Sequence, residues 1–252
     1  MTSSVRSALT KQWLTLCIDI AFCLLCAVGS SLAVVYGARW IGAVPAGTAS
    51  LTELGIWAVC AVLIIQNGLV VGFLRWRSAS DWRLLLGAPQ DIRSVVLASV
   101  IALPVVLAGN LVVGVIAALA GKTHNQIALL PLEAGDTAGQ VAFLLVAAVI
   151  VPCAEEILFR GYVYGRLEGL VRPTIAVVLS AALFAGAHTW SASTGSITLV
   201  LQTFAMGLVL GWVRQHSNSI FPSMIAHAGN NAFALTLVLS CVNHPELGCA
   251  RT

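Results

Sequence analysis

The sequence predicts an all-α, polytopic helical membrane protein with about seven transmembrane helices, and eight as the upper count. Three observations lead to this fold class. The 252 residues are 59% hydrophobic and only 9% charged, whereas a soluble domain carries about 25% charged residues. The mean hydropathy is +0.94. The apolar residues also gather in several runs close to the length of about 20 residues that a helix needs to cross a bilayer.

The first apolar run extends from Trp13 to Tyr36 and follows Arg6 and Lys11. It is longer than the apolar core of a secretory signal peptide, which has about 7–15 residues, so we expect it to remain as a membrane helix. Asp19 inside this run is expected to snorkel or to pair with a neighbour. Six further spans are expected near Leu54–Leu74, Ser94–Ala120, Ala138 onward, Pro173–Trp190, Gly195–Val213 and Ser219–Val242.

The placement of Lys and Arg predicts a cytoplasmic N-terminus. With that orientation, ten of the 13 basic residues fall in cytoplasmic segments and only Arg39, Lys122 and Arg251 fall outside, which is a strong positive-inside bias. Seven spans then place the C-terminus outside. A disulfide between Cys241 and Cys249 is one option in that oxidising environment.

Composition also excludes some function classes. A net charge of +3 is too small to indicate a nucleic-acid partner. No Cys-x-x-Cys pair stands beside a His-x-x-x-His pattern, so the sequence carries no zinc-finger signal. The partner that the composition implies is the lipid bilayer.

The fourth apolar run passes directly into charged residues. Glu155, Glu156 and Arg160 follow the run Val141–Val151 within a few positions. An ionisable group inside a bilayer is costly unless it faces a partner or a wet cavity. The candidate partners in the later spans are His188, His227, Asn230 and Asn231.

Helix geometry predicts that these groups meet at one depth. Glu155 precedes the expected turn at Val171 by 16 residues, and His188 follows that turn by 17 residues. Two antiparallel helices would therefore place both side chains about 25 Å from the turn. His227 lies about 10 Å into the last expected span, so it can reach the same depth.

The two neighbouring glutamates are expected to have different tasks. Arg160 follows Glu156 by four residues, a spacing that favours an ion pair on one face of a helix. Glu155 points about 100° away from Glu156. It is therefore free to face the other polar groups.

A carboxylate with two imidazoles suits hydrolysis, because a carboxylate can accept a proton from water and a His or Asn donor can stabilise an oxyanion. Asn231 shares a helix face with His227, and Asn230 is a rival for the donor role. The same three groups, Glu155, His188 and His227, could instead hold a divalent metal such as zinc. The residues leave both options open, a metal ion or none.

Three short patterns resemble a known family. They are Glu155-Glu156-x-x-x-Arg160, Phe184-x-x-x-His188 and His227-x-x-x-Asn231, in this order on separate spans. Together they resemble the motifs of the CPBP intramembrane proteases. That family is typified by the Ras-converting CAAX endopeptidase and includes Abi-like proteins linked to bacteriocin self-immunity.

The resemblance implies roles for six residues. The implied catalytic set is Glu155, Glu156, Arg160, His188, His227 and Asn231. In this set Glu155 would be the general base and His188 would position the attacking water. His227 and Asn231 would stabilise the oxyanion, and the remaining Glu–Arg pair would support them.

The resemblance also implies an integral membrane endopeptidase of a bacterial plasma membrane, either a metalloprotease or a glutamate-dependent protease. It would cleave a peptide or protein near the cytoplasmic leaflet, and the family's best-known reaction suggests a lipid-modified substrate. The chain would then divide into transmembrane helices without a motif (residues 1–137), a catalytic helix bundle (138–242) and a C-terminal tail (243–252).

Two other functions are alternatives. The chain could be a non-catalytic scaffold or a bacteriocin-immunity protein of the same fold. It could also be a proton-coupled transporter, since Glu and His inside a membrane also act as proton relays. The transporter is disfavoured because the sequence has no inverted repeat.

Overall fold

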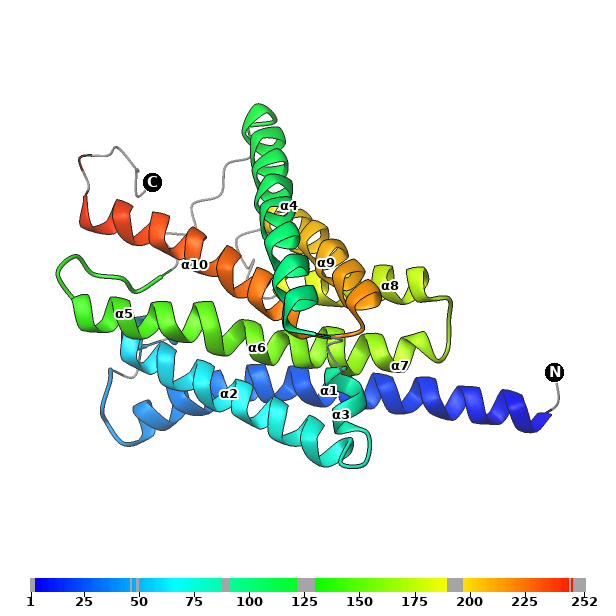
Figure 1. The fold of residues 1–252 in the computed structure, drawn as a ribbon. Helices are drawn as coiled ribbons and strands as arrows, with labels where there is room; N and C mark the ends of the chain where they lie inside the picture. The colour runs from blue at the N-terminus through cyan, green and yellow to red at the C-terminus, as the bar shows by residue number, and fades with distance from the viewer. Residues whose placement is uncertain are drawn as a thin grey trace.

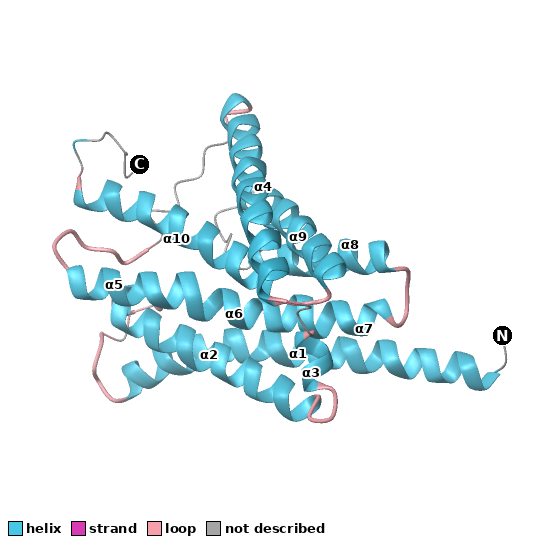
Figure 2. Cartoon of the chain, viewed as in Figure 1, coloured by secondary structure: helices cyan, strands magenta, loops and turns pink. Residues whose placement is uncertain are grey.

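The structure of this chain is a computed structural model that describes residues 3–45, 47–48, 50–87, 91–121, 130–189, 197–244 and 246. Within these ranges the regular structure is helical and no strand is formed (Figures 1 and 2). In this described part of the chain, six helices are long and apolar enough to cross a membrane, and a shorter apolar helix accompanies them. The predicted fold class, a polytopic helical membrane protein with about seven spans, is confirmed.

Most spans agree with their predicted positions to within a few residues, apart from the first, which is longer at both ends. The first three are α1 (Ser3–Trp40), α2 (Ile56–Arg77) and α4 (Ile92–Leu119), with η1 (Thr52–Leu54) and α3 (Trp82–Leu86) in the connections. The last three are α8 (Pro173–His188), α9 (Ile197–Ser217) and α10 (Phe221–Asn243). The short helix α3 lies in a segment expected to be a loop, because five residues are too few for a periodic apolar pattern.

The fourth span is one continuous helical segment with two π turns. Its pieces are α5 (Thr137–Leu145), η3 (Val146–Ile150), α6 (Val151–Glu156), η4 (Ile157–Val163) and α7 (Tyr164–Glu168). A π turn disturbs the usual helical hydrogen bonds, and carbonyls freed inside a bilayer need another donor. Three side chains donate to such carbonyls: Asn231 to Ala147 (3.1 Å), Ser180 to Phe159 (2.8 Å) and Arg214 to Arg160 (3.3 Å).

The main core lies where the fourth span meets α1, α2, α4, α8, α9 and α10. Leu74, Val163, Phe184 and Leu210 are completely buried there. Large apolar side chains such as Leu111 remain exposed on the outside of the bundle, as expected for helices that contact lipid. In the view of Figure 1, α4 runs at a steep angle to the fourth span, and it packs against α9 and α10.

Small residues bring α8 and α9 into close contact. A Cβ added at Gly207 would lie 3.0 Å from the Ala181 Cα, and one added at Gly211 would lie 2.9 Å from the Val177 Cγ1. Both distances are shorter than ordinary van der Waals contact. Glycine at these two positions therefore permits the approach of α9 to the helix that ends at His188.

A buried carboxylate joins α1 to the fourth span. Asp19 is 4% exposed; it accepts a hydrogen bond from Arg77 Nε at 3.1 Å and another from the Tyr162 hydroxyl. Arg77 ends α2 and Tyr162 lies in η4, so one carboxylate connects three spans. The expectation that Asp19 pairs with a neighbour is confirmed.

Different helix ends and connections lie at the two ends of the bundle. The start of α1 and the connection between α7 and α8 lie at the same end, and the last turns of α10 lie at the opposite end (Figure 1). This is the arrangement that the predicted orientation requires. Cys241 near the end of α10 is disulfide-bonded, and its predicted partner, Cys249, lies outside the described residues.

Candidate active site

The three sequence patterns meet in one place between α6, α8 and α10. Glu155 Oε1 lies 3.9 Å from His188 Nε2, and Glu155 Oε2 lies 3.7 Å from His227 Nε2. The side chains of Glu155 and His188 are 21% and 24% exposed, whereas that of His227 is 2% exposed. The three residues that were assigned a common depth from the sequence are therefore neighbours in the structure. The site is partly buried and partly open to solvent.

Glu156 has a different environment from its neighbour. It is completely buried, and its Oε1 accepts from Arg160 Nη1 at 2.8 Å and lies 2.9 Å from His227 Nδ1. Arg160 is also completely buried, donates to the Gly207 carbonyl at 3.2 Å and places its Cζ 4.5 Å from the centre of the Phe184 ring. The predicted Glu156–Arg160 pair is confirmed, and it additionally holds an imidazole of the site.

The hydrogen bonds at Nδ1 decide which nitrogen of each histidine faces Glu155. His188 Nδ1 lies 2.9 Å from the Phe184 carbonyl, which can only accept, so this nitrogen carries a proton. His227 Nδ1 has the Glu156 carboxylate in the same position. In a neutral imidazole the other nitrogen, Nε2, is then an acceptor. With both imidazoles neutral, two Nε2 lone pairs and one carboxylate surround the same small space.

Three acceptors around one space require a hydrogen-bond donor or a cation between them. The distances of 3.7 and 3.9 Å are too long for direct hydrogen bonds. Among the residues that the structure describes, no other donor lies within hydrogen-bond distance of Glu155. A water molecule satisfies this arrangement, because it can donate one proton to the carboxylate and the other to an imidazole.

The predicted metal ligands Glu155, His188 and His227 have suitable chemistry, since zinc binds imidazole and carboxylate. Within the described part of the chain, no three His, Cys, Asp or Glu side chains are placed so that they could hold an ion together. We therefore assign no step of the chemistry to a metal.

Phe184 fixes the positions of both imidazoles. Its ring centre lies 4.7 Å from that of His188 and 5.7 Å from that of His227, in edge-on contacts with interplanar angles of 67° and 86°. The ring itself is completely buried. It excludes water from one side of the site and limits rotation of the two side chains.

Asn231 and its rival Asn230 lie one turn beyond His227 on α10. Asn231 donates to the Ala147 carbonyl of the fourth span at 3.1 Å. Asn230 donates to Asn231 Oδ1 at 3.3 Å and accepts from Asn110 at 2.8 Å. Asn231 is therefore the residue of the two that joins the fourth span. Asn110 was missed from sequence, although an amide within an otherwise apolar span is a signal that could have found it.

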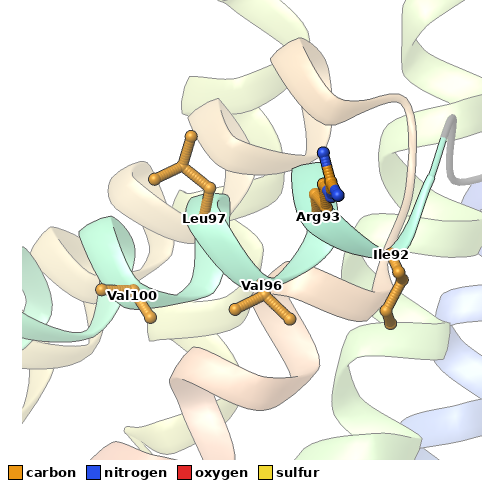
Figure 3. A pocket seen from close by; sticks show the side chains of 5 residues that line it. All are labelled: Ile92, Arg93, Val96, Leu97 and Val100. Carbon is orange, nitrogen blue, oxygen red and sulfur yellow. The ribbon is translucent and has the colours of Figure 1, made fainter.

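A surface groove elsewhere contains none of these residues. It follows one face of the first turns of α4 and is lined by apolar side chains and one guanidinium (Figure 3). The lining residues are Ile92, Arg93, Val96, Leu97 and Val100. The site between α6, α8 and α10 is thus formed by converging polar groups rather than by this groove.

The comparisons with known proteins concern the same part of the chain. Residues 137–233 match the model of the family described as type II CAAX prenyl endopeptidase Rce1-like. The chain is also similar to the UPF0177 protein YxdF of Lactococcus lactis subsp. lactis (strain IL1403), with 31% identity over 101 residues. The aligned region is 39% of this chain, and it spans about half (52%) of the length of that relative. No solved structure matches.

Proposed function

We propose that this chain is an intramembrane endopeptidase of the CPBP family in which Glu155 activates water. Residues 137–233 match the Rce1-like family model, and the chain is similar in part to a UPF0177 protein. The observation that carries the proposal is the setting of the Glu155 carboxylate. Its two oxygens face the Nε2 atoms of His188 and His227 at 3.9 and 3.7 Å. Glu155 is thus an acceptor that has no donor of its own among the described residues and is partly open to a substrate.

The proposed chemistry uses this geometry. A water molecule between Glu155 and His188 donates one proton to each of them. As its oxygen attacks the carbonyl carbon of the peptide bond, the proton on the carboxylate side passes to Glu155. Glu155 then transfers that proton to the amide nitrogen while the C–N bond breaks. The products are a carboxylic acid and an amine.

The remaining groups stabilise charge and geometry. In the tetrahedral intermediate the former carbonyl oxygen is negative, and we assign its stabilisation to the free N–H of Asn231 and to His227 in its protonated form, in which Nε2 also carries a proton. Glu156 holds His227 through Nδ1, and Arg160 balances the charge of Glu156 in the buried interior. Their task is to orient the imidazole and not to exchange protons with the substrate.

The test is cleavage of fluorogenic peptides by the purified protein in liposomes, with and without a prenylated cysteine in the peptide. We expect the variants Glu155→Gln and His188→Ala to lose cleavage by a factor of about 10²–10⁴ while remaining folded and inserted. Glu168→Gln is the matched control, because Glu168 is an exposed glutamate of the same span. In the wild type the Tyr164 hydroxyl donates to Glu168 Oε1 at 3.1 Å. A glutamine at this position keeps an oxygen that can accept this hydrogen bond.

Unchanged cleavage in both site variants would refute the proposal. Full biological activity of Glu155→Gln would instead identify a non-catalytic scaffold or immunity protein. Metal analysis of the active preparation and treatment with a chelator separate the two chemistries: we expect little bound metal and no loss of rate. The division into residues 1–137, 138–242 and 243–252 stays a prediction, to be tested by swapping the first segment between relatives.

A further inference from the structure

We propose that Asn110, on α4 and outside the matched residues 137–233, is a positioning residue that orients Asn231 through Asn230. The proposal rests on the proposed function, in which Asn231 stabilises the oxyanion. The carrying observation is a continuous row of amide hydrogen bonds. Asn110 Nδ2 donates to Asn230 Oδ1 at 2.8 Å, and Asn230 Nδ2 donates to Asn231 Oδ1 at 3.3 Å. Asn231 Nδ2 then donates to the Ala147 carbonyl at 3.1 Å.

The row has a direction because each amide has one accepting and one donating end. At one end, the carbonyl of Ala147 can only accept, so it requires the amino group of Asn231. At the other end, Asn110 presents its amino group and requires the carbonyl of Asn230. The direction is fixed at Ala147 and is followed by each amide in turn, so Asn231 is held through both of its polar atoms and Asn110 donates at the far end. One N–H of its amide remains without a partner among the described residues and can serve the substrate oxygen.

The energetic setting of Asn110 supports a role other than stability. Its Oδ1 is buried and has no hydrogen-bond partner within the described ranges. A buried unpaired acceptor destabilises the folded state. An apolar residue at position 110 would remove this unpaired acceptor, and the side-chain hydrogen bond that it would lose is the one to Asn230.

Gln202 provides a matched comparison on the neighbouring helix. Its Nε2 donates at 3.2 Å to the main-chain carbonyl of Asn110 and not to the side chain. Gln202 therefore connects α9 to α4 without entering the row of side-chain amides. Replacing it tests helix packing at the same location while leaving the direction of the row intact.

The first measurement does not depend on activity. Protein labelled with ¹⁵N at asparagine is compared by NMR in detergent, and Asn231→Ala assigns the side-chain amide signal of Asn231 by deleting it. We expect Asn110→Leu to shift that signal and Gln202→Leu to leave it in place. If the Asn231 side-chain signal keeps its chemical shift in Asn110→Leu, the proposal is overturned, whether or not the protein cleaves peptides.

The second measurement is a kinetic double-mutant cycle on the cleaved peptide. We expect Asn231→Ala to lower kcat about 100-fold, and Asn110→Leu to lower it about tenfold through misplacement of Asn231, with KM and the melting temperature unchanged. The double variant should equal Asn231→Ala alone, because Asn110 acts only through Asn231. The proposal would be overturned if the losses in kcat of the two single variants multiplied in the double variant. It would also be overturned if Asn110→Leu left kcat unchanged.

The failure of the proposed function is recognised separately. If wild-type protein and Glu155→Gln are equally inactive toward every peptide, the endopeptidase proposal falls, and the catalytic role of Asn110 falls with it. If wild-type protein is active and only the Asn110 cycle fails, the endopeptidase remains and the positioning role is wrong.

Discussion

Two carboxylate centres lie inside the bundle, and their donors differ. In the Asp19 centre, formed by Asp19, Arg77 and Tyr162, both carboxylate oxygens accept hydrogen bonds. In the Glu155 site, formed by Glu155, His188 and His227, the oxygens face imidazole nitrogens at 3.9 and 3.7 Å that are themselves acceptors when neutral. A saturated carboxylate holds helices together, whereas an unsaturated one is available for chemistry.

A contrast in burial and in partners separates two adjacent residues. Glu156 is completely buried and accepts from both Arg160 and His227 through one oxygen. The side chain of Glu155 is 21% exposed. Both are glutamates on one helix, so their chemical type does not separate their tasks. Their partners on η4, α8 and α10 do.

The largest effect is expected from Glu156→Ala. It leaves the guanidinium of Arg160 buried without its ion partner, and breaking a buried pair in this way costs about 3–5 kcal/mol. We expect a large loss of thermal stability measured in detergent, together with loss of cleavage. Glu155→Ala, the comparison variant, should retain the wild-type melting temperature. Equal melting temperatures for the two variants would contradict the division of tasks.

A smaller effect is expected from Asp19→Asn. Hydrogen bonds to charged groups contribute about 1.5–3 kcal/mol, and the loss should be near the lower value because the Arg77 side chain is 38% exposed and can turn to water. The melting temperature should therefore fall while kcat per folded molecule stays the same. A drop in kcat without a drop in stability would show that the Asp19 centre belongs to the catalytic apparatus.

The smallest effect concerns a carboxylate at the surface, Asp91, which is fully exposed. Asp91 caps α4 and accepts from the Ser94 backbone N–H at 2.8 Å and from its hydroxyl at 3.0 Å. These hydrogen bonds, led by the backbone one, lower the pKa of Asp91 below its ordinary value of 3.8. A lowered folded-state pKa stabilises the fold above the unfolded value, and this contribution is lost as pH falls through the folded value.

The measurement compares the wild type with Asp91→Asn, which keeps the capping oxygen and removes the charge. We expect a small advantage of the wild type in melting temperature at neutral pH, disappearing below pH 3.8. A difference that persists in acid would mean that the charge is not its cause.

Much of the site could be predicted from sequence because it depends on spacing along single helices. The pair Glu156–Arg160 follows from an i,i+4 separation, and the common depth of Glu155 and His188 follows from equal distances to one turn. The two π turns, by contrast, have no local pattern. They are stabilised by donors from other spans, such as Ser180 and Asn231.

The sequence by itself determined that the chain lies in a membrane, where its spans fall, and which polar residues need a partner there. These follow from hydropathy and helix periodicity, which act over a few turns. Only the tertiary structure decided which donor each carboxylate receives, that Asn231 rather than Asn230 reaches the fourth span, and that Asn110 joins them. Those choices depend on which faces of distant helices meet, and hydrogen bonds between helices leave no periodic trace in the sequence.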